Sequence, residues 1–324
     1  MMGMRSVLVR VPASTANLGP GFDCLGMALS LYTWIGMKPA EKATVIRLHG
    51  EGLEGIPLDK SNLIYEVAQL VFQETGTDLP ELEIDMYSDI PLTRGLGSSA
   101  SAIVGALTAA SELAGGGLDR DALLQIAARL EGHPDNVGAS LFGGIIAAAW
   151  DGTRADCLRI EPPAGLAALV AVPRFQLSTE KARHALPERL AMSDAVHNIG
   201  RSSLLVAALA GGRLDMIRHA MKDKLHQPYR AALIPGMAEV LEGAADHGAL
   251  GAALSGAGPT LLALIENGSP RTRELEAFLL STLSAAGVEA DLMLLQPDSA
   301  GAAVLEGGDP ALPFVERIKG EVHS

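Results

Sequence analysis

The glycine-rich stretch at residues 91–107, PLTRGLGSSASAIVGAL, constrains this chain most, because it separates two segments of different periodicity. Before it, apolar and acidic residues alternate over 81–90, which is typical of a half-exposed, antiparallel strand. After it, apolar residues recur at helical spacing as far as the glycines at 115–117. The stretch therefore predicts a strand, a tight glycine turn and the start of a helix.

The elements around this turn argue against two common nucleotide motifs. Gly95, Gly97 and Ala100 fit the looser dinucleotide pattern G-x-G-x-x-G/A, but that pattern needs a buried strand directly before it and a βαβ unit. Here the preceding strand is amphipathic, and the helix leads to a second helix over 119–131 with Asp119 as N-cap. The Walker string G-x-x-x-x-G-K-[ST] does not occur in the sequence.

The turn nevertheless has the physical properties of an anion site. Gly95 and Gly97 permit a positive φ and a close approach of the backbone to a ligand. Ser98 and Ser99 begin the helix, whose free N–H groups and dipole favour a phosphate. A serine-capped turn without a ligand has the same local sequence, so the turn alone leaves both interpretations open.

Two polar features follow the turn. Glu131 ends the second expected helix, where the helix dipole disfavours an acid by about 0.3–1 kcal/mol, and a nearby metal ion would explain its presence. The next segment, EGHPDNVGASLFGG, carries His133, Asp135 and Asn136, which we interpret as a polar loop that leads into an apolar strand.

Composition and charge exclude several classes of function. The formal net charge of −13 argues against a nucleic-acid surface, which needs basic clusters. The sequence has no run of ~18 uninterrupted apolar residues, as a membrane helix would need, and its start does not resemble a signal peptide. We therefore expect a cytoplasmic protein that does not bind a membrane. Cys24 and Cys157 form neither a disulfide framework nor a metal site. Core or surface roles suffice for the histidines without metal-ligand spacing, His184, His197, His219, His226 and His247.

We expect two domains, 1–160 and 161–324, with the boundary near the polar, proline-containing segment 152–165. In the first we expect strands over 5–11 and 43–50 and a helix that opens at Asn62. In the second, helices lie between the first two and between the last two of four strands, at 166–172, 249–254, 260–265 and 288–294. Two helices and four strands in this order predict a ferredoxin-like α+β sandwich.

Three separated strings together resemble those of the GHMP small-molecule kinases. They are VPASTANLGPGFDCLGMAL (11–29), PLTRGLGSSASAIVGAL (91–107) and GAALSGAGPTLLAL (251–264), and they follow the family's order across nearly the whole chain. Four strings are similar to those of one branch, the homoserine kinases: ANLGPGFDCLG, EGHPDNVGASLFGG, LSTEKARHALP and LHQPYRAALIPGM. The resemblance implies an α+β fold, with a ribosomal-protein-S5-like N-terminal domain and a ferredoxin-like C-terminal domain.

The resemblance also implies an activity: transfer of the γ-phosphoryl group of ATP to the side-chain hydroxyl of L-homoserine, with Mg²⁺. Family members are commonly homodimers. Two rival functions are another GHMP kinase, acting on mevalonate or shikimate, and a non-catalytic nucleotide-binding protein on the same scaffold. The intact Ser98, Ser99, Glu131 and Asn136 argue against the second rival.

The family's functional positions can be carried over one by one. The implied nucleotide site, with Asn62 at the adenine, comprises Asn62, Pro91, Arg94, Gly95, Leu96, Gly97, Ser98, Ser99 and Ala100. The implied magnesium ligands are Ser99 and Glu131. The implied amino-acid site comprises Asn17, Asp23, His133, Asp135, Asn136, Thr179, Arg183, Arg230, Gly256 and Gly258. The catalytic set is Asn136, Glu131, Ser99 and Asp135.

These residue types suit a zwitterionic substrate. Arg183 and Arg230 can hold a carboxylate through paired N–H donors, and Asp23 or Asp135 can accept from an ammonium group. Phosphoryl transfer depends on positioning and charge neutralisation more than on a strong base. Asn136 would therefore orient the hydroxyl, and Asp135 is the alternative candidate for a catalytic base.

Arg94 has two interpretations, a phosphate contact and an exposed arginine at a strand end, of which the second is the commoner case.

Overall fold

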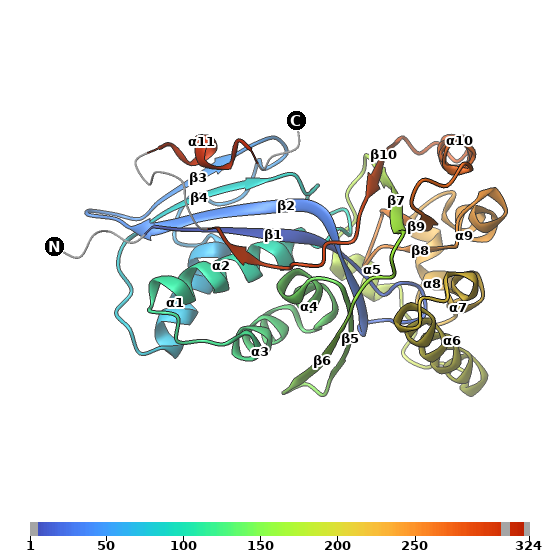
Figure 1. Ribbon diagram of the computed structural model, residues 1–324, viewed down its shortest axis with the longest axis horizontal. Coiled ribbons are helices and arrows are strands. Elements are labelled where there is room, and N and C mark those ends of the chain that lie inside the picture. Colours follow the sequence, from blue (N-terminus) through green and yellow to red (C-terminus); the bar gives the residue numbers. More distant parts are fainter. Residues whose placement is uncertain (1–5, 306–311, 321–324) are drawn as a thin grey trace.

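The computed structural model describes residues 6–305 and 312–320. Two sheets form the frame of the molecule (Figure 1), one of seven strands and one of four. The larger sheet has the order β11-β1-β2-β4-β3, and β5 extends it by pairing with β2 and β6. Its strands are β1 (Val7–Ala16), β2 (Leu25–Pro39), β3 (Val45–His49), β4 (Leu82–Ser88), β5 (Ile145–Trp150), β6 (Ala155–Ile160) and β11 (Ala303–Val304).

Alternation along β1 divides its side chains between the two faces of the larger sheet. Val7, Val9 and Val11 are buried in the main core of this half, together with residues of α1, α2, α3 and α4. Leu8 faces the opposite side, where it packs with Trp34 and the short helix α11 (Phe314–Ile318). Figure 1 shows α11 above the sheet and the four helices below it. These helices are α1 (Leu63–Glu74), α2 (Ser98–Leu113), α3 (Arg120–Glu131) and α4 (Asp135–Phe142).

The helix boundaries predicted from capping residues are confirmed. The Asn62 side chain accepts a hydrogen bond from the backbone N–H of Ile64 at the start of α1. Asp119 does the same for Ala122 in α3, which ends at Gly132 with φ +80°. The glycine turn at 95–97 leads directly into α2, as expected.

Three predictions about this half need correction. The strand β4 pairs antiparallel with β2 but parallel with β3, so the sheet is mixed. The segment 135–142, interpreted as a loop and the start of a strand, is helix α4, because its apolar side chains are buried at helical spacing. The strand begins only at Ile145, after two glycines of positive φ, and pairs with the unexpected strand β6.

The smaller sheet has the ferredoxin-like order β10-β7-β9-β8 with antiparallel neighbours. Its strands are β7 (Leu166–Pro173), β8 (Gly251–Leu254), β9 (Leu261–Glu266) and β10 (Ala290–Leu295). The connection from β9 to β10 is the single helix α10 (Thr272–Ala285). The connection from β7 to β8 is longer than one helix, comprising α5 (Thr179–His184), α6 (Met192–Ala210), α7 (Ile217–Ala220), α8 (Gln227–Arg230) and α9 (Met237–Gly243).

After β10 the chain returns to the larger sheet, where β11 pairs with β1 and α11 covers the outer face. Within residues 6–305 and 312–320, none of the helices has both the length and the apolar character needed to cross a bilayer.

Candidate active site

Three segments far apart in the sequence meet between the two sheets. The Ser255 hydroxyl, after β8, donates to the carbonyl oxygen of Gly95 at 2.6 Å and lies 2.8 Å from Oγ1 of Thr15 on β1. The backbone N–H of Gly256 donates to the carbonyl of Ala16 at 3.1 Å. These bonds join the end of β1, the turn before α2 and the turn between β8 and β9. We call this meeting point the three-segment junction.

Glycine is required at two positions of the three-segment junction. Gly95 and Gly97 have φ values of +79° and +71°, which other residues rarely adopt. A Cβ atom on Gly95 would lie 2.3 Å from the carbonyl oxygen of Ser255, and one on Gly97 would lie 2.1 Å from Oγ of Ser14. The residue before α2 is Gly97, which has no side chain, and no described side chain caps the first turn of the helix. Its free N–H groups and dipole suit an anion.

Oxygen donors from two helices meet beside this turn. Ser99, in the first turn of α2, donates to Oε1 of Glu131 at 2.6 Å. The Glu131 side chain, in the last turn of α3, is only 16% exposed. A carboxylate and a hydroxyl next to an anion site are ligands that hard divalent cations prefer.

Asp23 and Arg183 form a paired-donor ion pair across the cavity. The two terminal nitrogens of Arg183, on α5, donate to the two carboxylate oxygens of Asp23 at 2.9 and 3.0 Å. Asp23 lies in the loop between β1 and β2 with φ +55°. Burial alone would lower the pKa of Arg183, but its bonds and attraction to Asp23 outweigh burial and raise the pKa. Arg183 is therefore a permanent cation.

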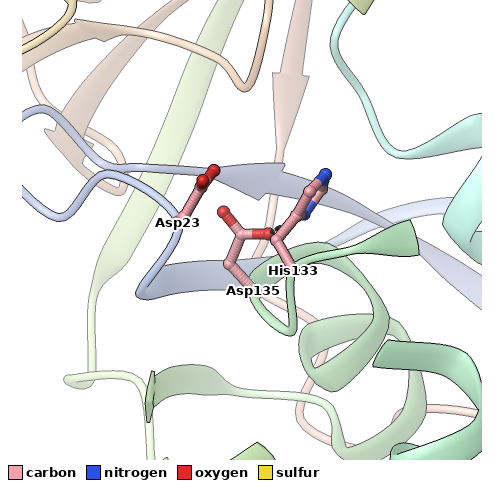
Figure 2. A group of neighbouring side chains, drawn as sticks. All are labelled: Asp23, His133 and Asp135. Carbon is pink, nitrogen blue, oxygen red and sulfur yellow. Dashed lines mark hydrogen bonds and ion pairs between the residues drawn. The ribbon is translucent and has the colours of Figure 1, made fainter. Parts of the chain in front are cut away.

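His133 and Asp135 lie next to Asp23, with Asp135 between the other two (Figure 2). Nδ1 of His133 is 2.7 Å from Oδ1 of Asp135. Burial lowers the pKa of His133, yet the hydrogen bond to Asp135 and the nearby acids outweigh it and raise the pKa above its ordinary value. The ligand atoms of these three residues lie within 4.8 Å of one another. The carboxylates of Asp23 and Asp135 are the acids of this cluster, and both residues line the same cavity as Arg183.

The amide of Asn136 has a fixed orientation. Oγ of Ser14, on β1, donates to Oδ1 of Asn136 at 2.9 Å, and the Ser140 hydroxyl in turn bonds to Ser14 at 3.3 Å. With Oδ1 engaged, Nδ2 is the amide group available as a donor, and Asn136 lines the cavity.

Arg230 contributes a second, buried cation. The residue is 2% exposed; its Nε donates to the carbonyl of Ala182 and its Nη1 to that of Gly256, both at 3.1 Å. Burial, and secondarily the charge of Arg183, lower the pKa of Arg230 to about 10. The group is therefore still charged at neutral pH, and within the described part of the chain its Nη2 has no hydrogen-bond partner.

Most of the predicted site residues line one cavity of about 140 Å³, which suits a small polar ligand. Those lining it are Asn17, Asp23, Gly95, Gly97, Ser98, Ser99, Ala100, Glu131, His133, Asp135, Asn136, Thr179, Arg183, Arg230, Gly256 and Gly258.

Four predicted nucleotide residues do not line this cavity. Pro91 and Arg94 line a neighbouring hollow that adjoins it at Thr93. Leu96 is fully buried. Asn62 uses both ends of its amide locally, since it caps α1 and donates to the carbonyl of Pro57 at 2.6 Å.

Several residues of the cavity were missed at the level of the sequence. Phe22 stands inside the string GFDCLG, which could have identified it. Its ring centroid lies 5.6 and 5.3 Å from the guanidinium carbons of Arg183 and Arg230. Leu177 and Ala257 also line the cavity; they stand inside the strings LSTEKARHALP and GAALSGAGPTLLAL but were not named as site residues. Ser14 orients Asn136 from a position 122 residues earlier.

The three-segment junction predicts that Gly95→Ala lowers the free energy of unfolding more than a similar substitution elsewhere. Gly287 is a matched control, because its φ is +77° but a Cβ there would meet no atom within 4 Å. Both variants acquire the same backbone strain, and only Gly95→Ala adds the clash with Ser255. We expect an additional loss of about 1–3 kcal/mol by urea denaturation. Equal losses would show that the close approach does not constrain the fold.

Two family models match the chain in the regions that carry the site. The model of the GHMP kinases N terminal domain matches residues 62–144, which include the glycine turn, Glu131 and Asn136. The model of the GHMP kinases C terminal region matches residues 205–282, which include Arg230 and Gly256.

Similar proteins cover nearly the whole chain. A homoserine kinase of Deinococcus radiodurans is 46% identical over 301 residues, 93% of this chain and 97% of that protein. A homoserine kinase of Desulfitobacterium hafniense is 45% identical over 92% of this chain and 100% of its own. The crystal structure of homoserine kinase from Cytophaga hutchinsonii superposes with a TM-score of 0.83 at 28% identity, covering 94% of this chain and 99% of that one.

Proposed function

The chain belongs to the homoserine kinases, a branch of the GHMP kinases, and on that basis we propose how its cavity performs the reaction. It transfers the γ-phosphoryl group of ATP to the side-chain hydroxyl of L-homoserine, a step of threonine biosynthesis. One observation carries the mechanism: the open start of α2 and the Asp23–Arg183 ion pair face the same cavity. A triphosphate and a zwitterion can therefore meet there.

The triphosphate of ATP lies, in this proposal, over the first turn of α2. Backbone N–H groups and the Ser98 hydroxyl bind its oxygens, and Leu96 contributes only its backbone because its side chain is buried. The adenine lies toward Asn62 and the hollow bounded by Pro91 and Arg94. Since the amide of Asn62 is engaged in capping, it acts there through its position at the start of α1.

Ser99 and Glu131 fit the magnesium ion that this chemistry requires. Their oxygens lie 2.6 Å apart beside the anion site, and both are hard donors. They would hold the ion next to the triphosphate. When bound, magnesium neutralises phosphate charge during transfer.

When L-homoserine binds, the ion pair between Arg183 and Asp23 is replaced by two ion pairs with the substrate. In the free enzyme Arg183 and Asp23 neutralise each other. The substrate supplies a carboxylate for Arg183 and Arg230 and an ammonium group for Asp23 and Asp135, so no charge in the half-buried cavity is left uncompensated.

Smaller residues define the shape of the amino-acid site. Nδ2 of Asn17 donates to the carbonyl of Gly256 at 2.9 Å, and its Oδ1 accepts from the backbone N–H of Asp23. Asn17 therefore holds the loop between β1 and β2, which carries Asp23, against the turn after β8. Thr179, at the start of α5, and Gly258 complete the wall.

Asn136 positions the attacking hydroxyl through Nδ2, its available donor. An amide cannot take up a proton, but a loose transition state delays proton loss and needs no strong base. Asp135 is the alternative proton acceptor, since only its Oδ1 is bonded to His133 and to the N–H of Asn136. Kinetics of Asp135→Asn against Asn136→Ala separate the two roles.

The organisation of the protein follows as part of the same proposal. We place the domain boundary between residues 160 and 161, because β6 ends at Ile160 and β7 begins at Leu166. A cytoplasmic location, and a homodimer on the ground that GHMP kinases commonly form one, belong to the same proposal.

A coupled assay of ADP release with L-homoserine, mevalonate and shikimate tests the function. L-Homoserine should give the highest kcat/KM, and Glu131→Gln should abolish turnover in the presence of magnesium, since it removes an anionic ligand. A preference for mevalonate or shikimate would assign the site to another GHMP kinase activity. ATP binding without any turnover would indicate a nucleotide-binding protein.

Arg183→Ala and Arg230→Ala should each raise the KM for L-homoserine about 10- to 100-fold, since a hydrogen bond to a charged group contributes roughly 1.5–3 kcal/mol. The KM for ATP should stay near the wild-type value. Arg189→Ala is the control, because Arg189 is exposed and does not line the cavity, and it should leave both KM values unchanged. An equal rise in both KM values for the Arg183 and Arg230 variants would contradict the carboxylate role.

A further inference from the structure

A buried imidazole precedes Arg230 by one helical turn. His226 is 0% exposed and lies between α7 and α8. Its Nε2 is 2.8 Å from the carbonyl oxygen of Gly19, and its Nδ1 is 3.2 Å from Nη1 of Arg230. A carbonyl only accepts and a guanidinium only donates, so the ring carries its proton on Nε2 and a lone pair on Nδ1. The contacts therefore select one neutral tautomer.

The charges around His226 are consistent with this tautomer. Oδ2 of Asp223 lies 3.6 Å from Nε2 of His226, but that carboxylate is already satisfied by donors from its own turn and from α6. These donors are the backbone N–H groups of Leu225, His226 and Gln227 and the side chain of Asn198. Burial and the Arg230 cation lower the pKa of His226, against the opposite effect of Asp223 and Asp23.

The imidazole completes the set of acceptors that hold the Arg230 guanidinium. The other two acceptors are the backbone carbonyls of Ala182 and Gly256. Nε and Nη1 are then engaged, and Nη2 is the donor available to a ligand. The neutral ring accepts from Arg230, whereas a protonated ring would repel it.

The same imidazole reaches the loop that carries the acid of the substrate site. Gly19 lies four residues before Asp23, and the Phe22 ring packs against His226 with centroids 5.2 Å apart. The Phe22 ring also lies 5.3 Å from the Arg230 guanidinium. His226 therefore contacts both the cation and the loop of the acid.

We propose that His226 is a positioning residue for substrate binding: as a neutral Nε2–H imidazole it fixes Arg230 relative to the loop that carries Asp23. Arg230 and Asp23 both line the cavity, so the imidazole would hold the cation for the carboxylate relative to the acid for the ammonium group. This inference rests on the proposed carboxylate role of Arg230.

Two substitutions at His226 separate its two bonds. His226→Asn keeps an acceptor near the Nδ1 position and loses the bond to Gly19. His226→Gln keeps a donor near the Nε2 position and loses the acceptor for Arg230. We expect His226→Gln to raise the KM for L-homoserine about tenfold or more, since a charge-assisted bond is lost, and His226→Asn to raise it clearly less. The KM for ATP should stay at the wild-type value in both.

His247→Gln serves as a matched control, because His247 also bonds to a backbone carbonyl, that of Gly243, but within the described residues has no hydrogen bond to a residue that lines the cavity. Equal KM values for L-homoserine in both His226 variants and the wild type, or a parallel rise in the KM for ATP, would overturn the proposal. If Arg230→Ala leaves the KM for L-homoserine unchanged, the carboxylate role itself is wrong. If Arg230→Ala raises it and His226→Gln does not, only the role of His226 is wrong.

A measurement on the unsubstituted protein covers the case in which these variants fail to fold. Nitrogen-15 NMR of histidine-labelled enzyme should show the buried imidazole protonated on Nε2 and unprotonated on Nδ1 at neutral pH. An imidazolium signal assigned to His226, or the Nδ1–H tautomer of the His226 ring, would overturn the proposal.

Discussion

The hydrogen bond from the buried Ser255 hydroxyl to the Gly95 carbonyl joins the turn after β8 to the turn before α2, beside the cavity. Gly95 precedes the end of α2 at which we propose that phosphate binds, and Ser255 precedes a turn of the proposed amino-acid site. A displacement at this bond would move both substrates' sites relative to each other. Because phosphoryl transfer depends chiefly on positioning, this contact between distant segments underlies the activity.

Charge in the cavity is balanced locally. A chain with a net charge of −13 does not attract ATP by its overall field, so the helix start must supply favourable dipoles at short range. In the proposed complex the amino-acid site stays neutral, since Asp23 and Arg183 pair with each other in the free enzyme and each would pair with a charge of the substrate. Glu131 is the remaining acid beside the phosphates, which is consistent with its proposed role at magnesium.

The sequence was informative where structure depends on local contacts or on a motif. The caps Asn62 and Asp119 fixed two helix boundaries, because each bonds to a backbone N–H two or three residues away. The sequence did not predict the short helix α4, since its eight residues combine polar side chains with an apolar pattern too brief to show helical spacing. Contacts across long separations were also invisible: His226 meets Gly19 at a distance of 207 residues in the sequence.

A crystal structure with L-homoserine and a non-hydrolysable ATP analogue tests the proposed arrangement of both substrates at once. The carboxylate of L-homoserine should contact Arg183 and Nη2 of Arg230, and the ammonium group should contact Asp23. The hydroxyl should then lie beside Nδ2 of Asn136 and face the γ-phosphate. An amino acid bound in the reverse orientation, or a triphosphate away from the start of α2, would contradict the account.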